Sequence, residues 1–263
     1  MFKEKSLSTR YPVLFSVILV LVVLVVTSID TDQNALGGKD FAVSRIVVIL
    51  GLLLLIKDKG FFSVNDGRGQ AFFATLLWGS PLVLIGVGSA LLTNGASFSE
   101  QTFPAFSDSA VFMLNMFLVG AVEELLYRGV VFNCLYETFE AKKSGVFRSI
   151  LLSALIFGFV HLVNLPTFPL LNVLMQVINA TCSEVLFATL YWKNHNLSGL
   201  ICVHTLTNFF ALFPQVLFTD NATSIVTASL SVGEVCITLL VGAGVPLMAA
   251  FFLIRKKQVI PIC

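Results

Sequence analysis

The sequence predicts an all-α, polytopic integral membrane protein, a helical bundle with about eight transmembrane helices that forms one membrane domain over residues 1–263. Hydrophobic residues make up 57% of the chain and charged residues 12%, whereas about 25% of an ordinary soluble domain is charged. Eight apolar stretches are about as long as a membrane-crossing helix. Lys and Arg are concentrated in alternate connecting segments. These three observations favour the bilayer as the main solvent.

Each predicted span is an apolar stretch near the roughly 20 residues that a helix needs to cross the hydrocarbon. In chain order they are Val13 to Ile29, Phe41 to Ile56, Gln70 to Leu92, Ala110 to Leu135, Val146 to Val163, Leu170 to Trp192, Leu197 to Phe218, and Ile225 to Ile254. The second is short and the last is long, so the number of spans is better determined than their ends. The first span follows a basic segment, and it is read as an uncleaved helix in preference to a signal peptide.

Basic residues predict the orientation, because cytoplasmic segments retain Lys and Arg. They lie before the first span, after the second, fourth and sixth spans, and in the tail: Lys3, Lys5, Arg10; Lys57, Lys59, Arg68; Lys142, Lys143, Arg148; Lys193; Arg255, Lys256, Lys257. The opposite segments contain mainly acidic residues. A multi-pass protein of the cell membrane with both termini in the cytoplasm is therefore predicted. The net charge of +1 gives no basic surface for nucleic acid, and membrane lipid is the expected surrounding.

Ionisable side chains inside the predicted spans mark a candidate site, because each costs a few kcal/mol to insert. Glu124 and Arg128 are i,i+4 neighbours in the fourth span, and an ion pair between them is predicted. Glu123 is rotated about 100° away on the same helix. It is therefore the freer carboxylate and the candidate general base, provided that a histidine or an ordered water shares its proton.

Two later spans add further polar groups at similar depth. His161 ends the fifth span, and His204 and Asn208 are i,i+4 neighbours in the seventh. An imidazole and an amide side by side can both donate hydrogen bonds to a developing oxyanion. Counted at about 1.5 Å per residue, these groups and Glu123 fall in the middle layer of the bilayer and could meet in one cavity.

The sixth span contributes Asn172, Gln176, Asn179 and Glu184. Helix–helix hydrogen bonding is their favoured role, with cavity lining second, and Glu184 is an alternative partner for Arg128. His195 lies beside Lys193 and is expected to be a solvated loop histidine.

Three motifs occur in order, each within a hydrophobic span: Glu123-Glu124-x-x-x-Arg128, Phe157-x-x-x-His161 and His204-x-x-x-Asn208. Together they resemble the motifs of the CAAX protease and bacteriocin-processing family (CPBP, or Abi), whose fold is CAAX prenyl protease-like. One such motif alone is weak, whereas three in this order are specific. The resemblance covers the segment from Ala110 to Phe218, so residues 110–218 are the predicted catalytic core.

The resemblance implies an intramembrane CAAX-type endopeptidase, a hydrolase that cleaves a peptide or protein substrate at the membrane. The residue that matches Glu123, helped by His161, would activate a water. His204 and Asn208 match the positions that hold the oxyanion, and Glu124 with Arg128 match a supporting pair. Some family members are proposed to be metalloproteases, and two histidines with a glutamate could hold zinc. A metal-free glutamic protease without a cofactor is favoured, because His204 and Asn208 are better explained as a pair of hydrogen-bond donors than as part of a zinc site.

Other interpretations remain open at this stage. Glu124 with Arg128 could be a purely structural ion pair, and the histidines could join helices by hydrogen bonds. A non-catalytic immunity or regulatory membrane protein of the same fold is the alternative function. A transporter with a proton-relaying carboxylate is the third, although no inverted repeat is visible.

Overall fold

The computed structural model describes residues 7–28, 39–61, 69–94, 105–142, 144–217 and 230–255. Within these ranges the regular structure is helical and contains no strand, so the predicted all-α fold is confirmed. The first helices are α1 (Leu7–Arg10), α2 (Pro12–Ser28), α3 (Lys39–Lys59), α4 (Gly69–Asn94) and α5 (Phe106–Glu124). The remaining α-helices are α6 (Asn133–Phe139), α7 (Gly145–Val160), α8 (Leu170–Asn194), α9 (Leu197–Leu217), α11 (Val232–Ile237) and α12 (Gly244–Arg255).

Short segments of other helix types join several of these into longer rods. The π-helix η2 (Leu125–Phe132) connects α5 to α6, so one rod runs from Phe106 to Phe139. The 3-10 segment η3 (His161–Asn164) extends α7, and the π-helix η4 (Thr238–Ala243) connects α11 to α12. Because π-helical turns are rare and often lie at functional sites, η2 is notable for following Glu123 and Glu124 directly.

In the part of the chain that the structure describes, five helices are long and apolar enough to cross a membrane, and the protein is a multi-pass membrane protein. They are Gly69–Leu91, Phe106–Phe139, Gly145–Asn164, Leu170–Asn194 and Val232–Arg255. The apolar helices Pro12–Ser28 and Leu197–Phe213 are shorter, and α3 has charged residues near both ends. Helical rods thus occupy all eight predicted positions. The last rod begins at Val232, later than predicted. Residues 29, 218 and 225–229 of the predicted spans lie outside the described residues.

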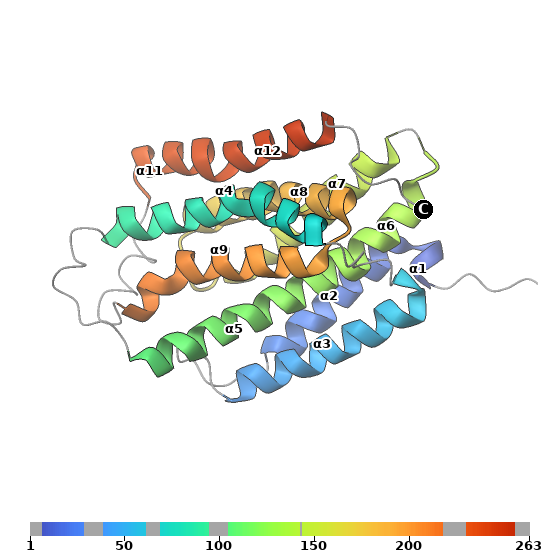
Figure 1. The fold of residues 1–263 in the computed structure, drawn as a ribbon, viewed down its shortest axis with the longest axis horizontal. Coiled ribbons are helices and arrows are strands. Elements are labelled where there is room, and N and C mark those ends of the chain that lie inside the picture. Colours follow the sequence, from blue (N-terminus) through green and yellow to red (C-terminus); the bar gives the residue numbers. More distant parts are fainter. Residues whose placement is uncertain are drawn as a thin grey trace, which may run out of the picture.

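The rods lie side by side with α5, α8 and α9 at the centre (Figure 1). Helix α9 packs against both α4 and α5, while α8 packs against α7 and α12. Helices α2 and α3 flank the α5 rod on one side of the bundle, and α11 and α12 lie at the opposite edge in Figure 1. This arrangement brings the motif-bearing parts of α5, α7 and α9 into the interior.

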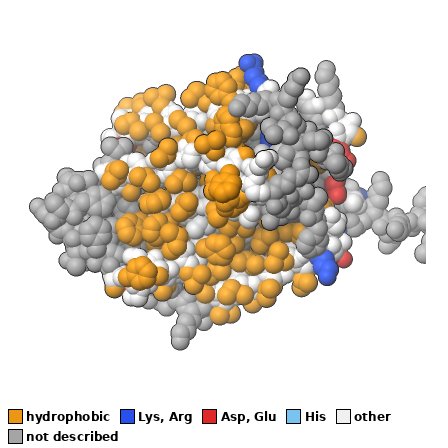
Figure 2. All heavy atoms as spheres, in the orientation of Figure 1, with side chains coloured by type: hydrophobic (Ala, Val, Ile, Leu, Met, Phe, Trp, Pro, Cys, Tyr) orange, Lys and Arg blue, Asp and Glu red, His pale blue; other side chains and the backbone are white. Residues whose placement is uncertain are grey.

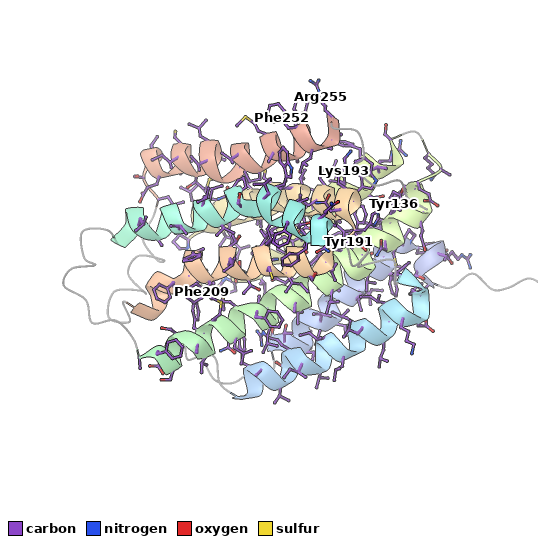
Figure 3. All side chains as sticks on the ribbon, viewed as in Figure 1. Tyr136, Tyr191, Lys193, Phe209, Phe252 and Arg255 are labelled. Carbon is purple, nitrogen blue, oxygen red and sulfur yellow. The ribbon has the colours of Figure 1, made fainter. Side chains whose placement is uncertain are left out.

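Side chains are distributed as expected for a protein surrounded by lipid. Hydrophobic side chains cover most of the described surface seen in Figure 2, and many large ones on α2, α3 and α12 are exposed. Figure 3 shows Lys193 of α8 and Arg255 of α12 near the end of the bundle that also holds Tyr136. The basic residues at the ends of α8 and α12 thus lie at the same end of the bundle, and the position of this end in the cytoplasm stays a prediction.

Candidate active site

Two consecutive glutamates end α5 in different surroundings. The Glu124 side chain is 0% exposed, whereas the Glu123 side chain is 30% exposed and borders a cavity. The difference follows from the helical rotation between neighbouring residues. Glu123 is therefore the more accessible carboxylate, as the sequence predicts.

His204 of α9 lies between these two carboxylates. Its Nε2 is 2.9 Å from Glu123 Oε2, and its Nδ1 is 2.6 Å from Glu124 Oε1. Because an ionised carboxylate only accepts hydrogen bonds, a ring that bonds to both must donate from both nitrogens. The imidazole is thus held at both ends, with its face stacked on Phe187 at a centroid distance of 5.1 Å.

A glycine explains how α9 approaches α5 closely enough for this contact. A Cβ at Gly120 of α5 would lie 3.1 Å from Thr205 Oγ1 and 3.3 Å from Thr205 N, on the residue that follows His204. A Cβ at this position would be tighter than usual packing, so Thr205 and its backbone would have to shift by a few tenths of an ångström. Gly120 was not singled out in the sequence, because its role depends on which helix lies opposite.

Arg128 joins two buried carboxylates. Its Nη1 is 3.1 Å from Glu124 Oε1, and its Nη2 donates to Glu184 Oε2 at 2.5 Å. The predicted Glu124–Arg128 ion pair is confirmed, and Glu184, suggested as an alternative partner, is bound at the same time. The Arg128 guanidinium also lies 4.8 Å from the centre of the Phe187 ring. The charges form one continuous network from α8 through α5 to α9.

His161 lies where α7 gives way to η3. Its Nδ1 is 3.2 Å from Phe157 O, one turn earlier in the same helix. When Nδ1–H donates to this carbonyl, Nε2 carries a lone pair and can accept a proton. The family resemblance implies that His161 helps Glu123 to activate a water, and that role stays a prediction. The imidazole that contacts Glu123 directly is that of His204.

Residues of all three motifs border one large cavity of about 770 Å³. Glu123 of α5, His161 of η3 and both His204 and Asn208 of α9 are in its wall. The predicted convergence of three helices on one cavity is therefore found. The cavity is large enough for a peptide segment, since ligand pockets are typically about 300–1,000 Å³.

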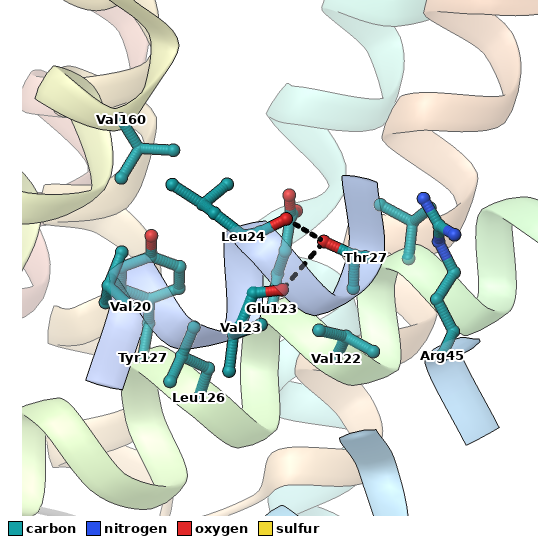
Figure 4. Close-up of a pocket in the computed structure, with 11 residues that line it drawn as sticks. Val20, Val23, Leu24, Thr27, Arg45, Val122, Glu123, Leu126, Tyr127 and Val160 are labelled. Carbon is teal, nitrogen blue, oxygen red and sulfur yellow. Dashed lines mark hydrogen bonds between the residues drawn. The ribbon is translucent and has the colours of Figure 1, made fainter. Parts of the chain in front are cut away.

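Glu123 also borders a second, smaller pocket of about 90 Å³ (Figure 4). This pocket lies among α2, α3, α5 and α7 and is bordered by Thr27, Arg45 and Tyr127. Thr27 Oγ1 donates to Val23 O at 2.9 Å and to Leu24 O at 3.2 Å. Glu123 thus borders both the large cavity and this smaller pocket.

The possible metal ligands that border the large cavity are Glu123, His161 and His204. Within the described ranges, no three His, Cys, Asp or Glu side chains converge in a metal-binding arrangement. The Nδ1 atoms of His204 and His161 face a carboxylate and a carbonyl, contacts that the second nitrogen of a metal-ligating histidine also makes. These contacts fit both interpretations, and the metal-free one stays a prediction.

The polar residues of α8 divide between two roles. Asn172, Gln176 and Asn179 border the large cavity. The sequence favoured helix–helix hydrogen bonding for these residues, with cavity lining as the second interpretation. Gln176 Oε1 also accepts a hydrogen bond from Asn164 Nδ2 at 2.9 Å. His195 lies in the α8–α9 connection, as expected, and follows the last residue of α8 with φ of 45°. It is half-buried and not fully solvated, because its ring packs on Tyr191 at a centroid distance of 5.7 Å.

Comparison with known proteins adds to this geometry. Residues 105–210 match the family model described as type II CAAX prenyl endopeptidase Rce1-like. The resemblance to the CAAX protease family is confirmed over this segment. The matched residues include the three motifs and the helices that enclose the large cavity.

A relative supports the same conclusion over a longer part of the chain. The protein named "Putative membrane peptidase YdiL" from Bacillus subtilis (strain 168) is 23% identical over 204 residues, which cover 71% of this chain and 76% of the relative. No solved structure matches the chain. The CAAX protease match and this relative together support a membrane protease at the level of the family.

Proposed function

We propose that this protein is an intramembrane endopeptidase that hydrolyses a peptide bond of a peptide or protein delivered at the membrane. The observation that carries the proposal is the position of Glu123. Its partly exposed carboxylate lies 2.9 Å from the His204 ring and borders a cavity that His161 and Asn208 also border. An ionisable group inside a bilayer is normally retained for a function, and this one has access to a space for substrate.

In the proposed reaction, Glu123 accepts a proton from a water as the water oxygen attacks the peptide carbonyl carbon. His161 assists through Nε2, the ring nitrogen that its backbone hydrogen bond leaves as an acceptor. The proton then passes to the leaving amide nitrogen, and the C–N bond breaks to give a carboxylic acid and an amine. No co-reactant other than water is required.

His204 and Asn208 are proposed to stabilise the oxyanion that forms on the carbonyl oxygen. His204 Nε2–H faces Glu123 in the resting structure. When Glu123 takes up the proton of the water, its negative charge is lost and its attraction for this N–H weakens. The same donor is then available to the oxyanion at the moment when that charge appears.

Glu124, Arg128 and Glu184 are proposed to position these groups. Glu124 contacts Nδ1 of His204 and fixes the orientation of the ring. Arg128 pairs with both Glu124 and Glu184, and so it links Glu124 to α8. The proposed reaction is written without a metal, as the sequence predicts. Glu123 is thus assigned the role of general base in a glutamate-dependent protease.

The proposal is tested by comparing the membrane peptidomes of cells that express the wild type, Glu123→Gln and Glu137→Gln. Glu137 is an exposed glutamate farther along the same rod, in α6, and provides the matched control. Peptides that accumulate with Glu123→Gln alone, at equal protein abundance, support the proposal. Identical peptidomes for all three, or a phenotype that survives combined loss of Glu123, His161 and His204, would instead favour a non-catalytic role.

A further inference from the structure

One wall of the large cavity is a row of polar side chains on α8. Asn172, Gln176, Asn179 and Ser183 all border the cavity and are spaced by 4, 3 and 4 residues. At 100° per residue they fall within about 60° of arc, so they share one face of the helix. The row is about 16 Å long at 1.5 Å per residue.

Contacts within the protein do not account for all of this polarity. The Asn179 Oδ1 atom is buried and has no hydrogen-bond partner among the described residues. It lies against η4, where a Cβ at Gly242 would be 2.7 Å away, so the neighbouring helix supplies space but no donor. A buried amide oxygen without a partner costs about 1–3 kcal/mol. The Asn179 side chain as a whole is half-buried and borders the cavity, so a ligand that reaches this amide from the cavity would offset that cost.

The chemistry of the row selects among peptide conformations. Each carboxamide offers both a donor and an acceptor, which match the C=O and N–H of a peptide backbone. A helical peptide satisfies these groups internally, whereas an unwound peptide at membrane depth needs partners for them. An extended segment of about five residues spans the length of the row, because a strand rises about 3.3 Å per residue.

We infer that the Asn172–Gln176–Asn179–Ser183 face of α8 binds the backbone of an extended substrate segment beside Glu123. The inference rests on the proposed function and names its substrate class: a polypeptide that enters unwound and is recognised mainly through its main chain. Apolar neighbours such as Phe168, Met175 and Leu230 also border the cavity and accommodate hydrophobic side chains of varied shape. Selectivity then depends on whether a segment can unwind at the membrane, and less on its sequence.

The test measures binding, so it does not depend on cleavage. The full chain carrying Glu123→Gln is placed in lipid nanodiscs and titrated with three fluorescent peptides. The first alternates leucine and alanine, the second has the same sequence with N-methyl groups on every alanine, and the third has the same sequence locked as a helix by a hydrocarbon staple. Only the first retains all its backbone donors in a form that can be extended.

The first peptide is expected to bind more tightly than the other two. Asn179→Leu, which removes the amide at similar volume, is expected to weaken binding of the first peptide about threefold to tenfold, the worth of one neutral hydrogen bond. It should barely alter binding of the N-methylated peptide. Gln176→Met provides a second variant if Asn179→Leu does not fold.

Thr189→Val is the matched control on the same helix. Thr189 is buried, donates to Val185 O at 2.7 Å and does not border the cavity, so its loss should leave peptide binding unchanged. The inference is overturned if the stapled peptide binds as tightly as the first, if the α8 amide variants bind like Thr189→Val, or if no peptide binds. Failure of the proposed function would look different: Glu123→Gln would cleave normally while the binding pattern persisted.

Discussion

His204 Nδ1 lies 2.6 Å from Glu124 Oε1, although the two residues are 80 positions apart in the chain. This contact ties α9 to α5 and directs the other ring nitrogen toward Glu123. The supporting pair of the first motif and the candidate catalytic groups are therefore parts of one network. Substitution of any charged residue in this network should therefore affect both the stability of the protein and its cleavage rate. Which of the two changes more should depend on where the residue lies in the network.

Arg128 should matter more for stability than Glu184. Arg128 lies between two buried carboxylates, those of Glu124 and Glu184. Arg128→Met leaves both carboxylates without this cation, whereas Glu184→Gln leaves Arg128 paired with Glu124. Removing one partner of a buried ion pair typically costs about 3–5 kcal/mol. Thermal unfolding in nanodiscs should show a much larger fall in Tm for Arg128→Met.

An equal fall in Tm for both Arg128→Met and Glu184→Gln would contradict this account of the pairing. Arg148→Met is a suitable control, because this arginine lies near the start of α7, away from the network.

Gly158 should be required for the position of His161. A Cβ at this residue would overlap Thr181 Oγ1 and lie 3.0 Å from Val177 O, so α7 would be pushed away from α8. Gly158→Ala should lower both Tm and cleavage rate, and adding Thr181→Ala should restore part of each. Gly88→Ala in α4 is the control, because nothing lies within 4 Å of its added Cβ. If Gly158→Ala behaves like Gly88→Ala, the packing account is wrong.

Asn208 should act on the chemical step. Removing one oxyanion donor typically lowers kcat about 100- to 1,000-fold, so Asn208→Leu is expected to reduce kcat strongly with little change in KM. Thr207→Val is the neighbouring control: Thr207 borders the same cavity, but its hydroxyl donates to Val203 O at 2.8 Å. Equal kcat values for the two variants would remove Asn208 from the proposed mechanism.

Both termini should lie in the cytoplasm. The basic residues Lys193 and Arg255 lie near one end of the bundle, and cytoplasmic segments retain such residues. A C-terminal green fluorescent protein should therefore fluoresce in a bacterial host, and a C-terminal alkaline phosphatase should be inactive. The reverse pattern would show that the charge alternation was misread.

Much of the fold could be predicted because the bilayer imposes simple rules. Length and apolarity located the eight rods, and helical periodicity alone paired Glu124 with Arg128 and turned Glu123 away from that arginine. These predictions use only neighbours along one helix. They needed no knowledge of which helices are adjacent.

Features that depend on contact between helices were less predictable. The sequence did not show which imidazole contacts Glu123, and the structure places the His204 ring there, where α9 lies close to Gly120 of α5. The amides of α8 were assigned to helix packing, because nothing in the sequence shows that their face borders a cavity. His195 was expected in solvent, because the sequence does not show that the α8–α9 connection is short or that Tyr191 packs against the His195 ring.

The central claim is that Glu123 activates the water that cleaves the peptide bond. Its most direct test is the single-turnover cleavage rate of a substrate identified from the peptidome comparison, measured with purified wild type, Glu123→Gln and Glu137→Gln in nanodiscs. General-base catalysis is typically worth about 100- to 10,000-fold. We predict a loss of at least about 100-fold for Glu123→Gln and none for Glu137→Gln. Cleavage by Glu123→Gln at the wild-type rate would contradict the account.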